Sequence, residues 1–258
     1  MAVSGLRGGL VVQMGASDVA TAEEVGRTGR YVVQLLDADE AAVSGARRRL
    51  RDGGLHGLVT VERHDEVGRL PYCENLVNLV IARDFAVSAA EIWRVLVPGG
   101  AAIGERGRLD EAALRAAGFE RIEERAGFVI ARKGVCAEMD EWSHPRHDAG
   151  GNAVSGDTRV GPPERVRWIA AATREVEGLV IAGGHNFYGG VLARDSFNGL
   201  RLWHADLREG ARDAADFDLP RLAGDRARPI ASSGHLFAVQ GDDVVALDAA
   251  TGEVSREF

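Results

Sequence analysis

The feature that most constrains the fold of this chain is a change in its sequence pattern near residue 135. Before that point, short apolar runs rich in Val, Leu or Ile alternate with amphipathic helix signals. Strands that are buried on both faces of a parallel sheet require such runs. Five runs meet this requirement, at residues 10–14, 31–36, 58–61, 76–82 and 101–104. The repetition of strand and helix predicts a Rossmann-like, doubly wound α/β sheet, which binds ligands where the carboxyl ends of its strands meet the loops.

Helix-capping residues stand between the apolar runs. Asp39 can cap a helix that ends at Gly53, and Asp110 can open another helix. Ser88 and Glu91 have the spacing of a capping box, in which each side chain bonds the other residue's backbone N–H. We therefore expect a helix to begin directly after each of Asp39, Ser88 and Asp110.

The second half of the chain has no helical periodicity. Residues 136–165 are rich in Gly and Pro, which predicts an irregular linker or a strap across a surface. Short strands with turn signals follow, and one turn pattern occurs twice, at Asp195 and Gly199 and again at Asp248 and Gly252. The aspartate can accept backbone N–H bonds across the turn, and the glycine can take a positive φ. The two aspartates are 53 residues apart, a period typical of propeller blades.

Composition excludes several classes of protein. With 258 residues, 45% of them hydrophobic and 27% charged, the chain is long enough for about two folded globular units. The net charge of −8, with acids and bases interspersed, argues against nucleic acid as a partner. Without a long apolar run or a secretory signal, we expect a cytoplasmic protein with no membrane partner. Cys73 and Cys136 lack metal-cluster spacing, so we expect both to be packing residues.

The histidines suggest structural roles. His144 and His147 lie near acidic residues at roughly metal-ligand spacing, but Pro145 prevents their presentation on one continuous helix. We therefore expect polar contacts within the strap and no metal site. His185 and His235 recur at equivalent places in the repeat, which favours packing on strands over catalysis.

Five segments of the first half resemble, in order, the motifs of class I S-adenosylmethionine-dependent methyltransferases. They are GLVVQMGASD at 9–18, LLDAD at 35–39, LPYCENLVNLVIA at 70–82, RVLVPGG at 94–100 and AAGFERIE at 116–123. The resemblance covers about residues 8–133. It implies S-adenosylmethionine as the cofactor and a methyl acceptor of unknown identity as the second partner.

The resemblance also implies a cofactor site. Its residues would be Gly15, Ala16, Ser17, Asp37, Ala38 and Asp65. In this family the acid that ends the second strand accepts bonds from the ribose hydroxyls, which is the place of Asp37. A plain helix-capping role is the alternative for Asp37, although Asp39 already fills the cap. Asp65 stands where the family contacts the adenine amino group, and a solvated loop acid is the alternative. Only Gly15 remains of the family's G-x-G-x-G loop, and the side chains of Ser17 and Val19 would intrude on the cofactor or force the loop to move.

The catalytic residues stay unknown at this point. Methyl transfer from a sulfonium is an in-line displacement, in which an enzyme mainly orients the reactants and excludes water. A general base is needed only where the acceptor must lose a proton. Arg83, Asp84 and Phe85 follow the fourth strand on the acceptor side, but we expect Arg83 and Asp84 to face solvent or to pair with each other. Asn78 stands where the family often has an aspartate, and it is alternatively a plain polar group of the strand.

The second half resembles a different family. Ala193, Asp195, Gly199 and Trp203 have the spacing of the tryptophan-docking motif of quinoprotein-like (PQQ-type) β-propellers. In that family the motif packs one blade on the next and does not by itself hold a cofactor. The second copy departs from the motif, because Arg256 stands where the tryptophan would be.

Three functional hypotheses follow from these resemblances. The predicted order is a methyltransferase domain at 1–135, a linker at 136–165 and about two propeller blades at 166–258. The first hypothesis is an S-adenosylmethionine-dependent methyltransferase with an altered cofactor loop. The second is a non-catalytic scaffold that keeps the same sheet. The third is a quinoprotein-like binding or assembly module, to which the sheet of the first half is an accessory. Open blade edges would favour aggregation or pairing with a missing remainder of the propeller.

Overall fold

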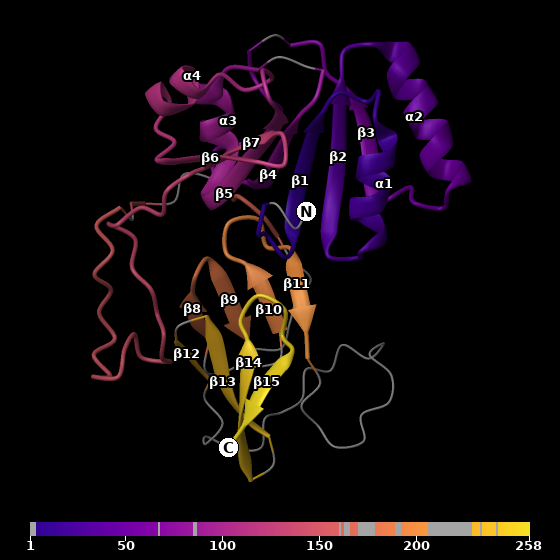
Figure 1. Ribbon diagram of the computed structural model, residues 1–258. Coiled ribbons are helices and arrows are strands. Elements are labelled where there is room, and N and C mark those ends of the chain that lie inside the picture. The colour runs from indigo at the N-terminus through magenta and orange to yellow at the C-terminus, as the bar shows by residue number, and fades with distance from the viewer. Residues whose placement is uncertain are drawn as a thin grey trace. The chain divides into compact units, whose positions relative to one another are not determined.

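The structure is a computed structural model that describes residues 4–66, 68–84, 87–159, 161–162, 166–169, 179–188, 192–205, 229–232, 234–240 and 242–258. The chain divides into two compact units, unit 1 (Met1–Val135) and unit 2 (Cys136–Phe258), which are coloured in sequence order in Figure 1. Within the described residues, no helix is both long enough and apolar enough to cross a membrane.

Unit 1 is built on a mixed sheet of seven strands in the order β3-β2-β1-β4-β5-β7-β6. β7 runs antiparallel to both of its neighbours, and the other pairings are parallel. The strands are β1 (Gly9–Met14), β2 (Tyr31–Asp37), β3 (Val59–Arg63), β4 (Val77–Ala82), β5 (Leu96–Glu105), β6 (Arg121–Arg125) and β7 (Phe128–Arg132). The predicted Rossmann-like sheet is confirmed. The sequence analysis did not identify the β6–β7 hairpin, because β6 is an edge strand of mostly polar residues without an apolar run.

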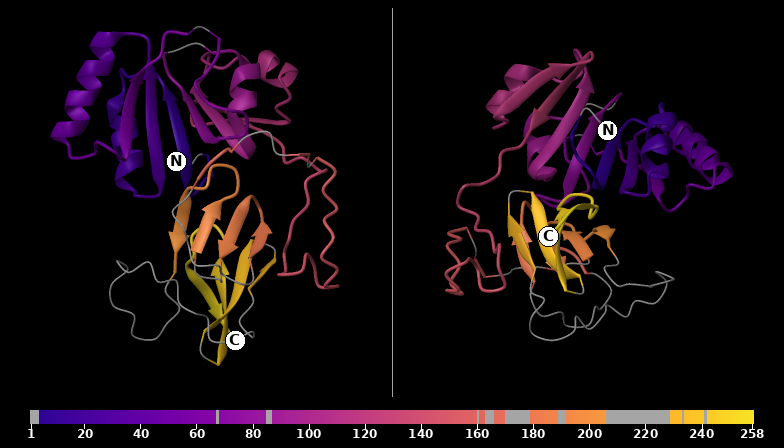
Figure 2. Two further views of the ribbon diagram at one scale, coloured as in Figure 1. Left: turned by 180° about the vertical axis from the view of Figure 1, so that it is seen from behind. Right: turned by 60° about the horizontal axis from the view of Figure 1, so that its bottom comes forward.

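Helices cover both faces of this sheet (Figure 1, Figure 2). α1 (Val19–Arg27) and α2 (Glu40–Asp52) pack on one face, and α3 (Ala89–Val95) and α4 (Glu111–Ala116) pack on the other. Successive strand residues point to opposite faces, so Leu35 joins the core under α1 and α2 while Leu36 joins the core under α3 and α4. Both side chains are fully buried. This burial on two sides explains why the strands are continuous apolar runs.

Aspartate and serine side chains begin the helices of unit 1. The Asp39 carboxylate accepts from Ala41 N at 2.8 Å at the start of α2, and Asp110 caps α4 in the same way. Ser88 accepts from Glu91 N at 3.2 Å, which is one half of the predicted capping box. The other half is absent, because the Glu91 carboxylate accepts from Leu70 N and Arg94 instead. α3 therefore anchors the loop between β3 and β4.

The order of the strands creates a switch point between β1 and β4. The chain moves outward from β1 through β2 to β3 on one side, and from β4 to β5 on the other. At such a point the loops diverge and leave a crevice outside the carboxyl ends of the strands. Residues 15–18 after β1 and residues 83–84 after β4 border this place.

The described residues of unit 2 form two antiparallel sheets of four strands each. The first has the order β11-β10-β9-β8 and the second the order β12-β13-β14-β15. The strands are β8 (Val180–Ala182), β9 (His185–Tyr188), β10 (Leu192–Asp195), β11 (Arg201–His204), β12 (Ile230–Ser232), β13 (His235–Gln240), β14 (Asp243–Asp248) and β15 (Val254–Glu257). These sheets are compatible with the predicted all-β region, and the propeller itself stays a prediction.

The two turns that share a sequence pattern have similar contacts. Asp195 accepts from the backbone N–H groups of residues 197 and 198, and Asp248 accepts from those of residues 250 and 251. Gly199 and Gly252 have φ values of +71° and +73°. A Cβ at Gly252 would lie 2.6 Å from the Trp203 ring, whose Nε1 donates to Ala249 O at 2.9 Å. The ring of Trp203 therefore packs on the second turn.

The predicted strap is irregular where the structure describes it, and it joins the edges of both sheets. Trp142 and Ile181 exchange two backbone hydrogen bonds of 2.8 Å, and Ala231 N donates to Ser143 O. His147 Nε2 lies 2.8 Å from Asp140 Oδ2, a polar strap contact of the predicted kind. Residues 160 and 163–165 of the predicted linker lie outside the described residues. Among those described, no His, Cys, Asp or Glu group is arranged to hold a metal ion.

Candidate functional site

The candidate site lies at the carboxyl edge of the unit 1 sheet, at the switch point between β1 and β4. Asp37 ends β2 beside it and is held there by two backbone donors. Ala16 N donates to Asp37 Oδ2 at 2.7 Å, and Asp39 N donates to Asp37 Oδ1 at 2.9 Å. Asp39 caps α2, so the Asp37 carboxylate is not needed for that role. It is oriented toward the loop after β1. Asp37 and the bend at Gly15 therefore lie side by side, since Gly15 N also donates to Leu36 O at 2.8 Å.

Packing within the protein requires a glycine at position 15. Its φ is +110°, and a Cβ there would lie 2.9 Å from Asp84 N and 3.3 Å from Arg83 Cβ. Arg83 N and Asp84 N both donate to Met14 O, which draws the loop after β4 against the bend. The space that the missing side chain leaves is thus filled by the protein's own β4 loop. The glycine was expected to make room for the cofactor, and the packing of β1 on β4 accounts for it instead.

The two residues that replace the other family glycines behave differently. Val19 begins α1 and is buried in the core below the helix, with 6% of its surface exposed. The expectation that its side chain would intrude on a ligand is therefore wrong, because the first turn of α1 directs it inward. Ser17 is exposed, and its hydroxyl donates to Asp84 Oδ2 across the switch point. Of the two, Ser17 alone is exposed at the switch point.

The remaining predicted residues lie in different environments. Ala38 is exposed directly after Asp37. Asp65 is also exposed and forms an ion pair of 2.8 Å with Arg63, so it remains on the same edge as a solvated acid. Asn78 lies near the opposite end of the sheet, where its Oδ1 accepts from Leu10 N at 2.8 Å. Its position supports the interpretation of Asn78 as a polar group of the strand.

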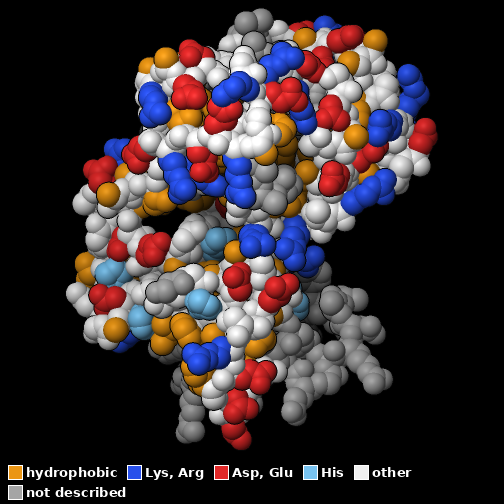
Figure 3. Space-filling model, viewed as in Figure 1, with side chains coloured by type: hydrophobic (Ala, Val, Ile, Leu, Met, Phe, Trp, Pro, Cys, Tyr) orange, Lys and Arg blue, Asp and Glu red, His pale blue; other side chains and the backbone are white. Residues whose placement is uncertain are grey.

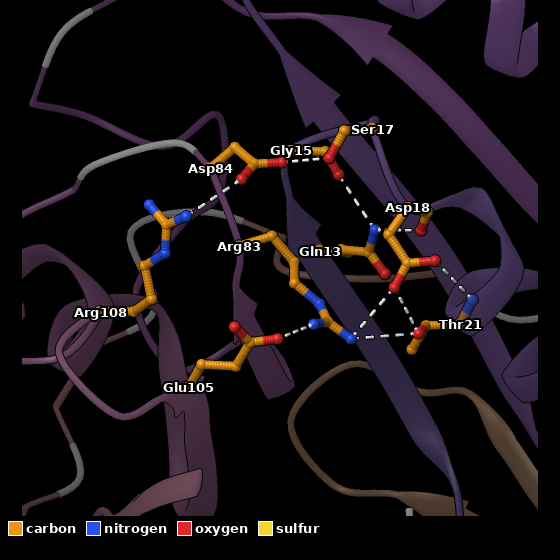
Figure 4. Close-up of polar contacts among 9 residues, drawn as sticks. All are labelled: Gln13, Gly15, Ser17, Asp18, Thr21, Arg83, Asp84, Glu105 and Arg108. Carbon is orange, nitrogen blue, oxygen red and sulfur yellow. Dashed lines mark hydrogen bonds and ion pairs between the residues drawn. The ribbon is translucent and has the colours of Figure 1, made fainter. Parts of the chain in front are cut away.

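Arg83 and Asp84 form a network with other loops (Figure 4). Arg83 lies 3.1 Å from Asp18 Oδ2 and 2.7 Å from Glu105 Oε1, and Asp84 lies 3.5 Å from Arg108. The expectation that these residues face solvent or pair with each other is wrong for Arg83, which is largely buried and pairs with Asp18 and Glu105. Asp84 is exposed, as expected, and its ion pair is with Arg108. Strand order explains this result, because β4 lies between β1 and β5 and its loop meets acids and bases from both sides.

Gln13 lies beneath this network and was missed by the sequence analysis. It is fully buried in β1, and its Nε2 donates to Gly15 O at 3.0 Å and to Asp18 O at 2.8 Å. These bonds hold the bend after β1 in shape. Among the described residues, Gln13 Oε1 and Arg83 Nε are the buried side-chain polar atoms without a hydrogen-bond partner. A polar residue inside an apolar strand was the available signal for Gln13.

Charge at this edge is mixed. Hydrogen bonding from the Thr21 hydroxyl lowers the pKa of Asp18, and Arg83 adds to the effect. Asp18 therefore stays ionised as the cap of α1 and as the partner of Arg83. Figure 3 shows acidic and basic side chains interspersed over the visible face of unit 1, with no continuous basic patch on that face. This distribution agrees with the interspersed charges of the sequence.

Comparison with known proteins gives likeness in structure only. No protein-family model and no curated protein matches this chain. A solved structure titled a putative S-adenosyl-L-methionine-dependent methyltransferase from Methanococcus maripaludis is 17% identical, covers 51% of this chain and 80% of its own, and has a TM-score of 0.45. A SAM-dependent methyltransferase from Aquifex aeolicus is 17% identical and covers 51% of this chain and 85% of its own, with a TM-score of 0.40.

Another similar structure is titled a [4+2]-cyclase, SpnF. It is 20% identical and covers 51% of this chain and 77% of its own, with a TM-score of 0.43. About half of this chain is thus similar to folds found in proteins with methyltransferase and other titles.

Proposed function

We propose that unit 1 is an S-adenosylmethionine-dependent methyltransferase domain, with the nucleoside half of the cofactor against Asp37. The observation that carries this proposal is the position of the Asp37 carboxylate, which ends β2 and is tied to Ala16 N after β1. A carboxylate offers about four lone-pair sites, and the two backbone bonds occupy two of them. The other two suit the two hydroxyls of a ribose.

The residues present fit the two halves of the cofactor unequally. On the nucleoside side, Asp37 would accept from the ribose and the exposed Asp65 would accept from the adenine amino group. On the amino-acid side, the Ser17 hydroxyl and the Asp84 carboxylate meet across the place between β1 and β4. The fit is therefore good at β2, whereas the side chains at the switch point must part before the remaining half can enter.

The chemistry that the cofactor supplies is an electrophilic methyl group on a sulfonium. The contribution of this chain would be orientation by the ribose contact and exclusion of water, which are the main requirements of an in-line displacement. Asp84 follows β4 on the acceptor side and would take a proton from an acceptor that has to lose one.

Calorimetric titration of the full chain with S-adenosylmethionine and S-adenosylhomocysteine tests the proposal. We expect micromolar binding that Asp37→Ala weakens by at least about tenfold, since the charge-assisted hydrogen bonds to the two ribose hydroxyls are lost. Asp39→Ala is the matched control, because it removes a neighbouring carboxylate that caps α2. Absence of binding at millimolar ligand, or equal losses in both variants, would contradict the proposal and favour the non-catalytic scaffold.

For unit 2 we propose a second function, as part of a quinoprotein-like β-propeller that serves in binding or assembly. Two similar contacts support it, because Trp203 packs on Gly252 and Trp168 packs on Gly199, where a Cβ would lie 2.4 Å from the ring. A tryptophan that docks on the turn of the following sheet fits blade stacking. An experimental structure tests this proposal, since the two sheets must be related by rotation about one common axis; sheets that face each other as a sandwich would contradict it.

A further inference from the structure

The contact between Ser17 and Asp84 closes the switch point with exposed side chains. The Ser17 hydroxyl, on the loop after β1, donates to the carboxylate of Asp84 on the loop after β4 (Figure 4). Arg108, from the loop after β5, lies 3.5 Å from the other carboxylate oxygen. About half of the Asp84 and Arg108 side chains is exposed, at 46% and 53%. Three loops from distant parts of the sequence are thus connected at the surface.

A second layer of contacts below this one holds the loops in place. Arg83 donates to the Thr21 hydroxyl at 3.1 Å and pairs with Asp18 and Glu105. The Arg83 side chain is only 20% exposed, so this layer is less accessible than the Ser17–Asp84 contact. The backbone bonds to Met14 O fix the separation of the β1 and β4 loops from beneath. The upper contact can therefore open by side-chain rotation alone, while the lower layer keeps its geometry.

The position of the upper contact determines what it blocks. A ligand that lies on Asp37 at the end of β2 reaches β1 next and then β4, because the strands are neighbours in that order. Ligands of open α/β sheets extend over the carboxyl ends at the switch point. The part of the ligand beyond the ribose must consequently cross between Ser17 and Asp84. Asp37 itself makes no hydrogen bond with these two side chains.

We propose that Ser17, Asp84 and Arg108 form a latch that admits the nucleoside half of the cofactor and excludes its amino-acid half until the latch opens. This proposal rests on the proposed function of unit 1. In this proposal Ser17, which stands where the family has a glycine, regulates the access of the cofactor to the switch point. A glycine at position 17 would have no hydroxyl to donate. The latch makes binding of the complete cofactor weaker than the sheet alone would allow.

Titration of the full chain with adenosine and with S-adenosylhomocysteine tests the latch, because adenosine lacks the amino-acid half. In the unaltered protein we expect the two affinities to agree within about threefold. Ser17→Ala should tighten S-adenosylhomocysteine binding about tenfold, the value of one charge-assisted hydrogen bond, and leave adenosine binding unchanged. Ser44→Ala, on the exposed face of α2 where the hydroxyl contacts Glu40, is the matched control and should change neither affinity.

The outcomes separate the latch from the proposed function. If S-adenosylhomocysteine already binds much more tightly than adenosine and Ser17→Ala changes nothing, the latch is wrong and the methyltransferase proposal stands. If Ser17→Ala tightens both ligands equally, the contact does not discriminate between the halves and the latch is again wrong. If neither ligand binds to either protein, both proposals fall, since opening the contact admits no cofactor.

Discussion

Lys133 carries the prediction that can be worked out furthest from the structure. It is the only lysine of the chain and is 6% exposed at the end of β7. Its ammonium donates to Asn75 Oδ1, Trp93 O and Leu96 O, at 2.6, 2.9 and 2.8 Å, and lies 3.9 Å from the centroid of the Trp93 ring. All three donors are used, yet burial lowers the pKa of Lys133 to about 8.

The lowered pKa makes the stability of unit 1 depend on pH. The unfolded chain holds the proton up to its ordinary pKa of 10.5, whereas the folded chain releases it from about 8. Between these values the unfolded state binds more protons, so the free energy of unfolding rises with pH. From about pH 7 to about pH 9.5 the expected gain is about 2 kcal/mol. Below pH 8 both states are protonated, and the cost of burying the charge is present in full.

Two measurements check this prediction. In protein labelled with ¹³C at the lysine Cε, the one lysine signal should titrate near pH 8. Urea unfolding should be followed through Trp93, in a background where the other three tryptophans are phenylalanine. The gain with pH should disappear in Lys133→Arg, whose charge does not titrate in this range. A lysine signal that titrates at pH 10 or above, or an equal gain in the arginine variant, would refute the reasoning.

Three further predictions concern single side chains. Gly15→Ala should destabilise unit 1 by about 3 kcal/mol in a urea titration, because the new Cβ would lie 2.9 Å from Asp84 N and φ is +110°. Gly107→Ala is the control, and it should cost only about 1 kcal/mol because its φ is +87° but no atom lies within 4 Å. Gly252→Ala should displace Trp203 and shift its fluorescence, whereas Gly234→Ala, at φ +79° with no neighbour within 4 Å, should leave the emission unchanged. Hydrogen bonding from Arg94 lowers the pKa of Glu91 below its ordinary value of 4.5. The stability that Glu91 contributes is therefore present above about pH 4.5 and is lost as the pH falls. Glu91→Gln should flatten that part of the acid unfolding curve, and an unchanged curve would contradict the assignment.

Much of the candidate site could be anticipated from the residues alone. Asp37 and Asp39 were assigned different positions because one ends an apolar run and the other precedes a helical pattern, and the structure confirms that Asp39 is the cap. The bend at Gly15 was also found. Its reason was not, because the atoms that require it belong to Arg83 and Asp84, far along the chain.

The sequence by itself determined the strands β1 to β5, the residues that begin α2, α3 and α4, and where the sequence pattern changes between the two units. These features depend on apolar periodicity and on hydrogen bonds between residues a few positions apart. Only the tertiary structure decided that Val19 points into the core, that Ser17 meets Asp84 and that Arg83 pairs on both sides. Such contacts depend on β4 lying beside β1, and that neighbourhood comes from packing the whole sheet, since no local pattern encodes it.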